Sequence, residues 1–202
     1  TLAEYAAAKR RILGFQDAQG TVLLPPNEPE SLEWARAAHG RVHELNFGRL
    51  ATLNLTEQDL PFHEPYRLAS AWAAIEAALL LGVAQEQLRE RLRSFRGLPH
   101  RMETLAVPAP FRVVNNGVAT HPEPTEAALR HTDGPVVLLA GGKDKGLPLE
   151  GLASATQRCA RVYLHGAGGA RLARACAEHA VAAREFNTSR EAFDAALEEL
   201  LP

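Results

Sequence analysis

The chain lacks long apolar runs, has few cysteines and carries no strong excess of either charge. No apolar run reaches the roughly 18–20 residues that a membrane-spanning helix needs, and the closest, Leu68–Leu81, contains Glu76. The formal net charge of −2 gives no reason to expect binding to nucleic acid or to an acidic membrane surface. The two cysteines, Cys159 and Cys176, are expected to be reduced, buried thiols of a cytoplasmic protein rather than a disulfide.

The sequence also lacks several catalytic signatures. It contains no GxxxxGK(S/T) phosphate loop, no Gly-x-Ser-x-Gly elbow and no Cys-His arrangement that would indicate a hydrolase. The glycines of Gly166–Gly169 do not complete a GxGxxG dinucleotide fingerprint. His39 and His43 have helical spacing, but Gly40 between them argues against a metal-binding pair on a helix.

Apolar periodicity divides the sequence into two parts. In the first part it predicts helices at 2–13, 31–39 and 66–81, a further apolar helical stripe at 88–95, a strand at 21–24 and one or two short strands within 41–60. Gly97–Pro99 then forms a natural linker. In the second part strands alternate with helices, with strands at 111–115, 135–140, 162–165 and 184–186 and helices at 123–130, 149–157, 169–179 and 189–201. This alternation indicates a mainly parallel sheet with right-handed crossovers.

Polar residues follow two of these strands. The strand 135–140 runs into Gly141–Gly146, where two glycines allow close backbone approach and two lysines could bind a carboxylate or phosphate. The segment Asn115–Pro122 places Asn and Thr side chains before a helix entry, which can hold an anion. Ligands bind at the carboxyl ends of parallel strands, although a solvated connection and an ordinary Asn-Gly turn explain the same residues.

Five segments, in sequence order, resemble the Mur ligases, and in particular their D-glutamate-adding branch. The segment Phe95–Glu103 matches a F-x-G-L-P-H-R-x-E junction, and Leu138–Gly146 matches a GGxDKG loop. The other three are Tyr5–Ile12, which resembles a helix with a functional lysine, His63–Ala69, which resembles HNxxNxLA, and Asn115–Pro122, which resembles NDSKATNP.

The resemblance implies an α/β fold in which residues 1–96 form the distal part of a central P-loop-type ATPase domain. Residues 97–202 would form a truncated, Rossmann-like C-terminal domain that binds the amino acid. The implied reaction uses ATP and Mg²⁺ to activate the terminal carboxylate of UDP-N-acetylmuramoyl-L-alanine as an acyl phosphate, which the amine of D-glutamate attacks. We expect a cytoplasmic monomer with no nucleic-acid or membrane partner. Because the phosphate loop is absent, we expect this chain alone to be inactive.

The resemblance also assigns roles to individual residues. Lys9 would be carbamylated and help to place Mg²⁺, because a carbamate supplies the oxygen ligands that a hard cation prefers. From the residues alone, however, a lysine in an Ala-rich helix such as Lys9 is expected to be a solvated side chain. The remaining assignments are His63, His100, Arg101 and Asn116 near the nucleotide, and Thr120 and Lys145 on D-glutamate.

Several positions depart from the family pattern. Glu64 and Arg67 replace the two asparagines of HNxxN, and Asn116, Gly117 and Val118 replace the Asp, Ser and Lys of NDSK. Loss of a charged partner at a ligand site typically costs a few kcal/mol. The sequence therefore leaves open a catalytically impaired Mur-like binding or regulatory protein, and a related ligase of the folylpolyglutamate synthetase kind.

Overall fold

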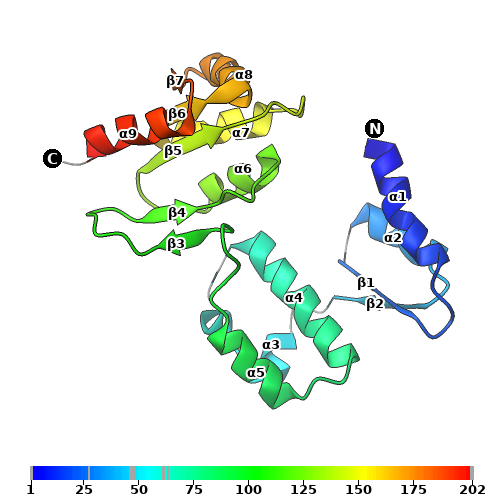
Figure 1. Cartoon of the computed structure of the whole chain (residues 1–202). Helices are drawn as coiled ribbons and strands as arrows, with labels where there is room; N and C mark the ends of the chain where they lie inside the picture. The colour runs from blue at the N-terminus through cyan, green and yellow to red at the C-terminus, as the bar shows by residue number, and fades with distance from the viewer. Residues whose placement is uncertain (1, 27, 46–48, 61, 63, 201–202) are drawn as a thin grey trace. The chain divides into compact units, whose positions relative to one another are not determined.

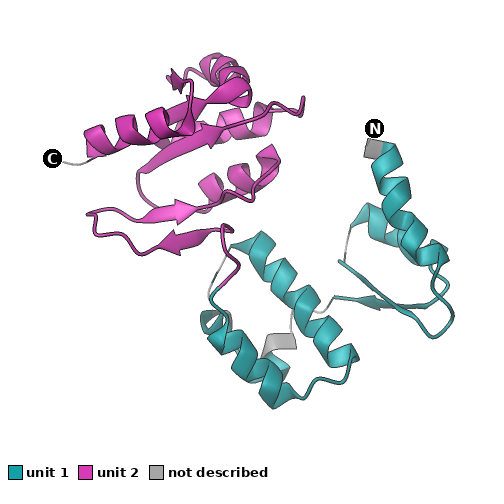
Figure 2. Cartoon of the chain, in the orientation of Figure 1, with its two compact units in different colours: residues 1–96 teal, residues 97–202 magenta. Residues whose placement is uncertain are grey.

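The computed structural model describes residues 2–26, 28–45, 49–60, 62 and 64–200. The chain divides into two compact units, Thr1–Arg96 and Gly97–Pro202 (Figure 2). The division lies at the start of the Gly97–Pro99 segment, where Gly97 has a positive φ of 90°. Each unit has its own hydrophobic core.

The first unit begins with a small α/β layer. A two-stranded parallel sheet joins β1 (Thr21–Leu24) to β2 (Arg41–Glu44), and α1 (Leu2–Gly14) and α2 (Pro29–Ala37) pack with it (Figure 1). Alternate residues of β1 point to opposite faces of the sheet. Val22 and Leu24 are therefore buried, and they share a core with Leu13 of α1 and with Trp34 of α2.

The rest of the first unit is helical. It contains α3 (Arg49–Thr52), a 3₁₀ helix (Glu57–Asp59), α4 (Pro65–Leu80) and α5 (Gln85–Ser94). The expectation of one or two short strands within 41–60 is confirmed by β2, and among the described residues no second strand follows near Leu53 and Leu55. Both side chains are instead buried in a core that also contains the fully buried Ile75 of α4.

The second unit is an α/β domain with two sheets. The hairpin of β3 (Glu103–Leu105) and β4 (Val113–Asn115) is antiparallel, and its first strand was not predicted. A three-stranded parallel sheet has the order β5-β6-β7, with bounds Val136–Gly141, Cys159–His165 and Arg184–Phe186. The helices are α6 (Pro122–Arg130), α7 (Glu150–Ala155), α8 (Gly166–Glu178) and α9 (Ser189–Leu200), and a 3₁₀ turn at Thr156–Arg158 follows α7.

Helices cover both faces of the parallel sheet (Figure 1). On one face Leu138 and Leu164 join α6, α7 and α8 in one core, while on the other Tyr163 packs against Ala192 and Ala196 of α9. A capping box begins α9, because Glu191 N donates to Thr188 Oγ1 at 3.1 Å and Thr188 N donates to Glu191 Oε2 at 3.1 Å.

The two cysteines are free thiols, and the predicted burial holds for Cys176, whereas Cys159 is only partly buried. Burial raises the pKa of Cys159 to about 11, so this thiol is protonated near neutral pH. Among the described residues, no helix is long and apolar enough to cross a membrane.

Candidate functional site

A cavity of about 890 Å³ lies in the second unit, at and below the carboxyl ends of β4 and β5. Thr120, in the loop between β4 and α6, and Lys145, in the loop between β5 and α7, both line it. Both side chains are exposed to solvent. The two residues assigned to D-glutamate thus come from neighbouring loops and border one cavity.

The loop that carries Lys145 leaves β5 through two glycines that the local geometry requires. Gly141 and Gly142 have φ values of 151° and 102°, in a region that favours glycine. A Cβ on Gly141 would lie 2.0 Å from the carbonyl oxygen of His165. Gly142 N donates to His165 O at 3.0 Å, and Gly168 N donates to Gly142 O at 2.8 Å. The loops after β5 and β6 are therefore packed backbone against backbone.

A guanidinium from α8 holds the far side of the same loop. Arg171 donates through Nη1 to Asp144 Oδ1 at 2.7 Å and through Nη2 to the carbonyl of Leu147. The carboxylate of Asp144 also accepts the backbone N–H of Gly146 at 2.9 Å. The Gly146 amide and the Arg171 guanidinium together hold the pKa of Asp144 below its ordinary value. Because these contacts flank Lys145, they fix the backbone from which its side chain extends.

Thr120 has a titratable neighbour. Its Oγ1 lies 3.1 Å from Nδ1 of His121, and both residues are exposed. The roles depend on the tautomer of the imidazole: Nδ1 accepts the hydroxyl proton of Thr120, or Nδ1–H donates to Oγ1 and leaves that proton for another acceptor. The Thr120 hydroxyl can therefore donate to a carboxylate when Nδ1 of His121 carries a hydrogen.

The turn at the start of the second unit is tied to the loop after β4. His100 Nδ1 lies 2.8 Å from Asn115 Nδ2, Met102 N donates to Asn116 Oδ1 at 3.3 Å, and His100 N donates to Glu103 Oε2 at 2.8 Å. His100 and Met102 both have positive φ, at 60° and 50°. Such backbone is strained for residues other than glycine, and strain of this kind concentrates at functional sites.

These contacts place the residues assigned to the nucleotide. His100 Nδ1 is engaged by Asn115 and Asn116 Oδ1 by the backbone of Met102, so both polar atoms are bonded inside the unit. The Arg101 side chain is exposed and has no bonded partner within the described part of the chain. His63 lies outside the described residues.

Lys9 stands apart from this group, in the first unit. It lies on an exposed face of α1, with Nζ 5.4 Å from the centre of the Tyr5 ring. Within the described residues, no three His, Cys, Asp or Glu side chains gather as a metal site. A carbamate on Lys9 would supply oxygen ligands for Mg²⁺.

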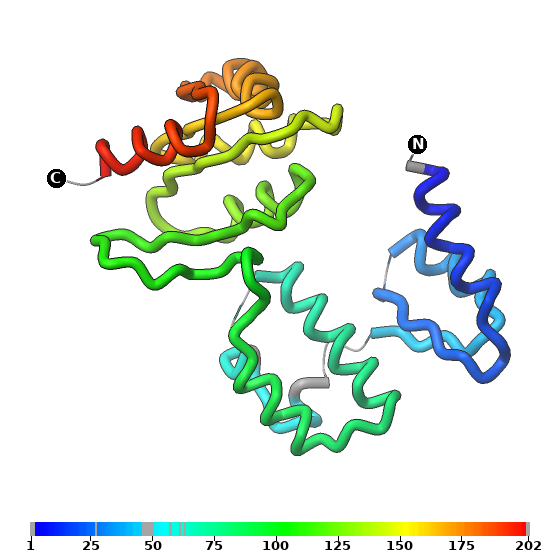
Figure 3. The backbone as a smooth tube through the Cα atoms, in the orientation of Figure 1, coloured from blue at the N-terminus to red at the C-terminus, as the bar shows by residue number. Residues whose placement is uncertain are grey.

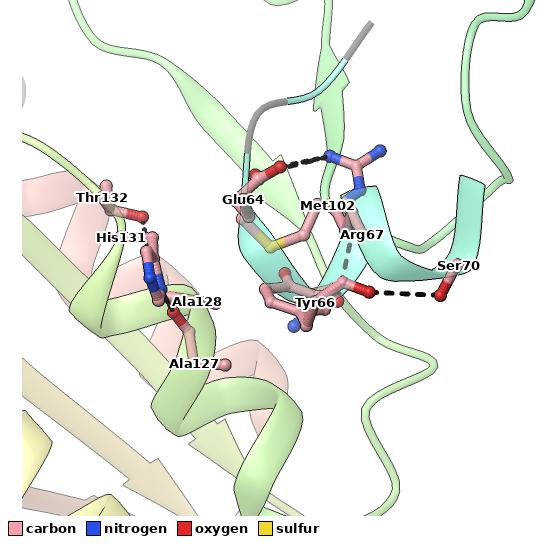
Figure 4. Close-up of polar contacts among 10 residues, drawn as sticks. Glu64, Tyr66, Arg67, Ser70, Met102, Ala127, Ala128, His131 and Thr132 are labelled. Atoms are coloured by element: carbon pink, nitrogen blue, oxygen red, sulfur yellow. Dashed lines mark hydrogen bonds and ion pairs between the residues drawn. The ribbon is translucent and has the colours of Figure 1, made fainter. Parts of the chain in front are cut away.

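The two residues that replace the asparagines of HNxxN bind each other. Arg67 Nη1 lies 3.3 Å from Glu64 Oε2, and its guanidinium stacks 4.3 Å from the centre of the Phe62 ring. Figure 4 shows this ion pair at the start of α4, together with the bond from Ser70 Oγ to the carbonyl of Tyr66. The pair is mostly buried, with side chains 13% and 18% exposed.

The C-terminal end of α6 also borders the cavity. At the end of α6, Thr132 Oγ1 donates to the carbonyl of Ala128 and His131 Nδ1 contacts that of Ala127, each at 2.8 Å (Figure 4). These bonds reach carbonyls of the last helical turn, where Ala128 O also accepts the backbone N–H of His131 at 3.3 Å. Thr132 also lines the cavity, so its wall includes a capped helix end.

Sequence reasoning missed two residues of this site. Arg171 carries no motif signal, because an arginine on an Ala-rich helix is typical of a solvated face. His121 belonged to a noticed segment, but its contact with Thr120 depends on side-chain geometry.

Comparison with known proteins gives the family. No protein-family model matches the chain. The chain is 41% identical over 98 residues to a UDP-N-acetylmuramoylalanine–D-glutamate ligase of Roseiflexus sp., covering 48% of this chain and 21% of that one. It is 32% identical over 167 residues to the ligase of the same name from Lacticaseibacillus casei, covering 74% of this chain and 36% of that one.

Solved structures share the fold. MurF from Acinetobacter baumannii matches with a TM-score of 0.70 at 20% identity, over 98% of this chain and 50% of that one. A bifunctional folylpolyglutamate synthase/dihydrofolate synthase from Yersinia pestis matches with a TM-score of 0.66 at 18% identity, over 96% and 51%. The fold is thus the α/β fold with parallel sheets that these ligases and synthases share. The chain belongs to the Mur ligase family, and it spans about half or less of the length of the relatives it matches.

Proposed function

We propose that this chain is part of an ATP-dependent ligase that adds D-glutamate to UDP-N-acetylmuramoyl-L-alanine during the synthesis of peptidoglycan precursors. The observation that carries the proposal is the shared cavity of Thr120 and Lys145. It is supported by relatives that carry the name of this ligase. The fold likeness to solved structures does not distinguish among ligases, because both matched structures are 20% identical or less.

In this proposal the second unit holds the amino acid. The ammonium of Lys145 pairs with a carboxylate of D-glutamate, and the hydroxyl of Thr120 donates to the same ligand. The bonds from Arg171 to the Lys145 loop keep the ammonium in place without a large ordering cost on binding. Arg101 is the cation of the junction that remains available to a nucleotide phosphate.

The residues assigned to ATP and Mg²⁺ fit these groups to different degrees. When bound, ATP would supply the phosphoryl group that activates the acceptor carboxylate, and Mg²⁺ would neutralise charge on its phosphates. Lys9 is exposed and could be carbamylated, which fits a metal ligand, and the exposed Arg101 fits a phosphate. The paired Glu64 and Arg67 fit a nucleotide base less well, because their hydrogen-bonding groups already bind each other.

A titration of the 202-residue chain with D-glutamate, followed by backbone NMR, tests the amino-acid site. We expect shifts centred on Thr120 and Lys145, much weaker binding in Lys145→Ala, and little change in the control Lys143→Ala. Lys143 lines the same cavity, and its change to Ala removes the same positive charge. Equal losses in both variants would show a general charge effect and contradict a specific role for Lys145.

The ion pair of Glu64 with Arg67 favours a second candidate, a Mur-like binding protein with impaired nucleotide affinity. Calorimetry of a full-length protein with ATP and Mg²⁺ separates the two. Ordinary micromolar affinity would count against the impaired protein, and affinity restored only by the double change Glu64→Asn and Arg67→Asn would support it.

A further inference from the structure

A histidine at the end of β6 borders the cavity of the second unit. His165 is the last residue of β6 and lines the same cavity as Thr120 and Lys145. Its side chain is partly buried. Within the described part of the chain its imidazole has no hydrogen-bond or ion-pair partner, and it does not cap α8, the helix that it precedes. Both ring nitrogens are therefore available to a ligand.

The register of the strands explains why this imidazole is unbonded. β5 and β6 run side by side in the same direction (Figure 3), and His165 pairs with Gly141 of β5 and with Phe186 of β7. Paired residues of neighbouring strands carry their side chains on the same face of the sheet. Gly141 has no side chain, and Phe186 presents only an apolar ring. Neither neighbour can bond to the imidazole, so its polar atoms are left for the cavity.

The packing of β6 shows on which face of the sheet the imidazole lies. Tyr163 precedes His165 by two residues, so the two side chains lie on the same face. Tyr163 packs against Ala192 and Ala196 of α9. Its ring also stacks on that of Phe186, with the ring centroids 5.9 Å apart. His165 is therefore the polar end of a mainly apolar face, at the edge where parallel sheets bind ligands.

The charges around this end of the cavity favour an anionic ligand. Two lysines of the loop after β5 line the cavity together with Arg171 of α8. The carboxylate of Asp144, in the same loop, is already bonded to Arg171 at 2.7 Å. Asp133, the other acidic residue among those lining the cavity, precedes β5 at the opposite end of that strand. A carboxylate that His165 binds would therefore come from a ligand.

We propose that His165 binds one carboxylate of the amino acid while Lys145 binds the other, which makes the site specific for a dicarboxylic amino acid. This role of His165 rests on the proposed function, in which Lys145 pairs with a carboxylate of D-glutamate. A neutral imidazole has one N–H group and an imidazolium has two, so His165 can donate to a carboxylate in either state. A site built to hydrogen-bond a substrate group rejects analogues that lack it, because its own polar group is then left unpaired.

Titration of the 202-residue chain with D-glutamate, followed by NMR, tests this role through two variants. His165→Phe keeps a ring but removes both ring nitrogens. We expect it to weaken binding at least about tenfold, because a hydrogen bond to a charged group is lost. His165→Gln keeps an N–H donor and should retain part of the affinity. Unchanged binding in His165→Phe, or an equal loss in both variants, would overturn the inference.

The opposite end of α8 provides a matched control. His179 follows the last residue of α8, and its Nε2 lies 2.8 Å from Oε1 of Glu150. His179→Phe therefore removes an imidazole from the same unit, at a position where the ring already has a partner. We expect this variant to bind D-glutamate as the unchanged chain does. A loss equal to that of His165→Phe would show a general effect on the unit and overturn the assignment to His165.

Two monoamides of the ligand show which carboxylate His165 binds. D-glutamine lacks the side-chain carboxylate, and D-isoglutamine lacks the α-carboxylate. We expect His165→Phe to weaken the binding of one monoamide as strongly as that of D-glutamate and to affect the other little, because the other has no carboxylate at His165. Lys145→Ala should show the reverse preference. Equal effects of His165→Phe on both monoamides would overturn the inference and leave the proposed function standing. If D-glutamate shifts neither Thr120 nor Lys145 in the unchanged chain, the proposed function fails and this inference fails with it.

Discussion

The two units of this chain hold their proposed site residues in different ways. In the second unit Lys145 and Thr120 extend from loops that backbone hydrogen bonds, two positive-φ glycines and an arginine hold in place. In the first unit Lys9 lies exposed on α1, and Glu64 and Arg67 bind each other. The difference teaches that the second unit holds the backbone of its proposed site residues through its own contacts. In the first unit the proposed Lys9 contacts the Tyr5 ring on the same helix.

The largest predicted effects come from substitutions in the separate hydrophobic cores of the two units. Leu164 in the second unit and Ile75 in the first are fully buried. Changing either to Ala should lower the free energy of unfolding of its own unit by about 3 kcal/mol, because a buried cavity is left behind. Denaturant unfolding followed by NMR signals from both units measures this. Equal destabilisation of both units by either variant would contradict independent cores.

Adding a methyl group at Gly141, in the turn after β5, should strongly destabilise the second unit. Gly141→Ala places a Cβ 2.0 Å from a carbonyl oxygen, whereas Gly142→Ala meets no atom within 4 Å and has only the cost of its positive φ. We expect losses of about 3 kcal/mol and about 1–2 kcal/mol in the stability of the second unit. Thermal denaturation measures both variants. Similar losses of stability would mean that the positive φ, and not the close contact with His165, requires glycine at position 141.

A buried carboxylate gives the first unit a polar contact of its own. Glu76 is 1% exposed, and its Oε2 lies 3.0 Å from Nε2 of His43 in β2. Removing the imidazole in His43→Ala should destabilise the first unit by about 1–2 kcal/mol. His43→Gln, which keeps a hydrogen-bonding group, should restore part of this stability. No recovery in that variant would indicate that packing, rather than the bond, matters.

The smallest effect concerns pH and the loop of Lys145. The pKa of Asp144 is lowered in the folded chain, so its contribution to stability is present above its ordinary pKa and is lost as pH falls through the folded value. Arg171→Ala should raise the pKa of Asp144, as measured by NMR titration of its carboxyl carbon. Arg174→Ala, on the same helix and without a bond to Asp144, should raise it less. An equal rise of the Asp144 pKa in both variants would show that the overall positive charge, and not the bond from Arg171, lowers this pKa.

Much of the second unit could be predicted from the sequence, because its strands and helices alternate with clear apolar periods. The strand that enters Gly141 and the capping box of α9 are local patterns, and the structure has both. Of the one or two short strands expected within 41–60, one forms as β2, whereas Leu53 and Leu55 are buried in a helical core, because so short an alternation does not distinguish a strand from turns packed on helices.

The site was predictable only where chemistry and local chain order coincide. The GGxDKG motif marks a loop at a strand end, and Lys145 lies there. The bond from Arg171 to Asp144 and the pairing of Glu64 with Arg67 depend on where side chains point after folding. Charge and spacing indicate that such groups exist, but they do not indicate which partner each one binds.

The most direct test of the account is a measurement of nuclear Overhauser contacts between D-glutamate and the 202-residue chain. The account predicts contacts from the ligand's methylene protons to the Thr120 methyl and to the ε-methylene of Lys145, and their loss when L-glutamate is used at the same concentration. Contacts confined to residues outside the loops of Thr120 and Lys145, or identical for the two enantiomers, would contradict it.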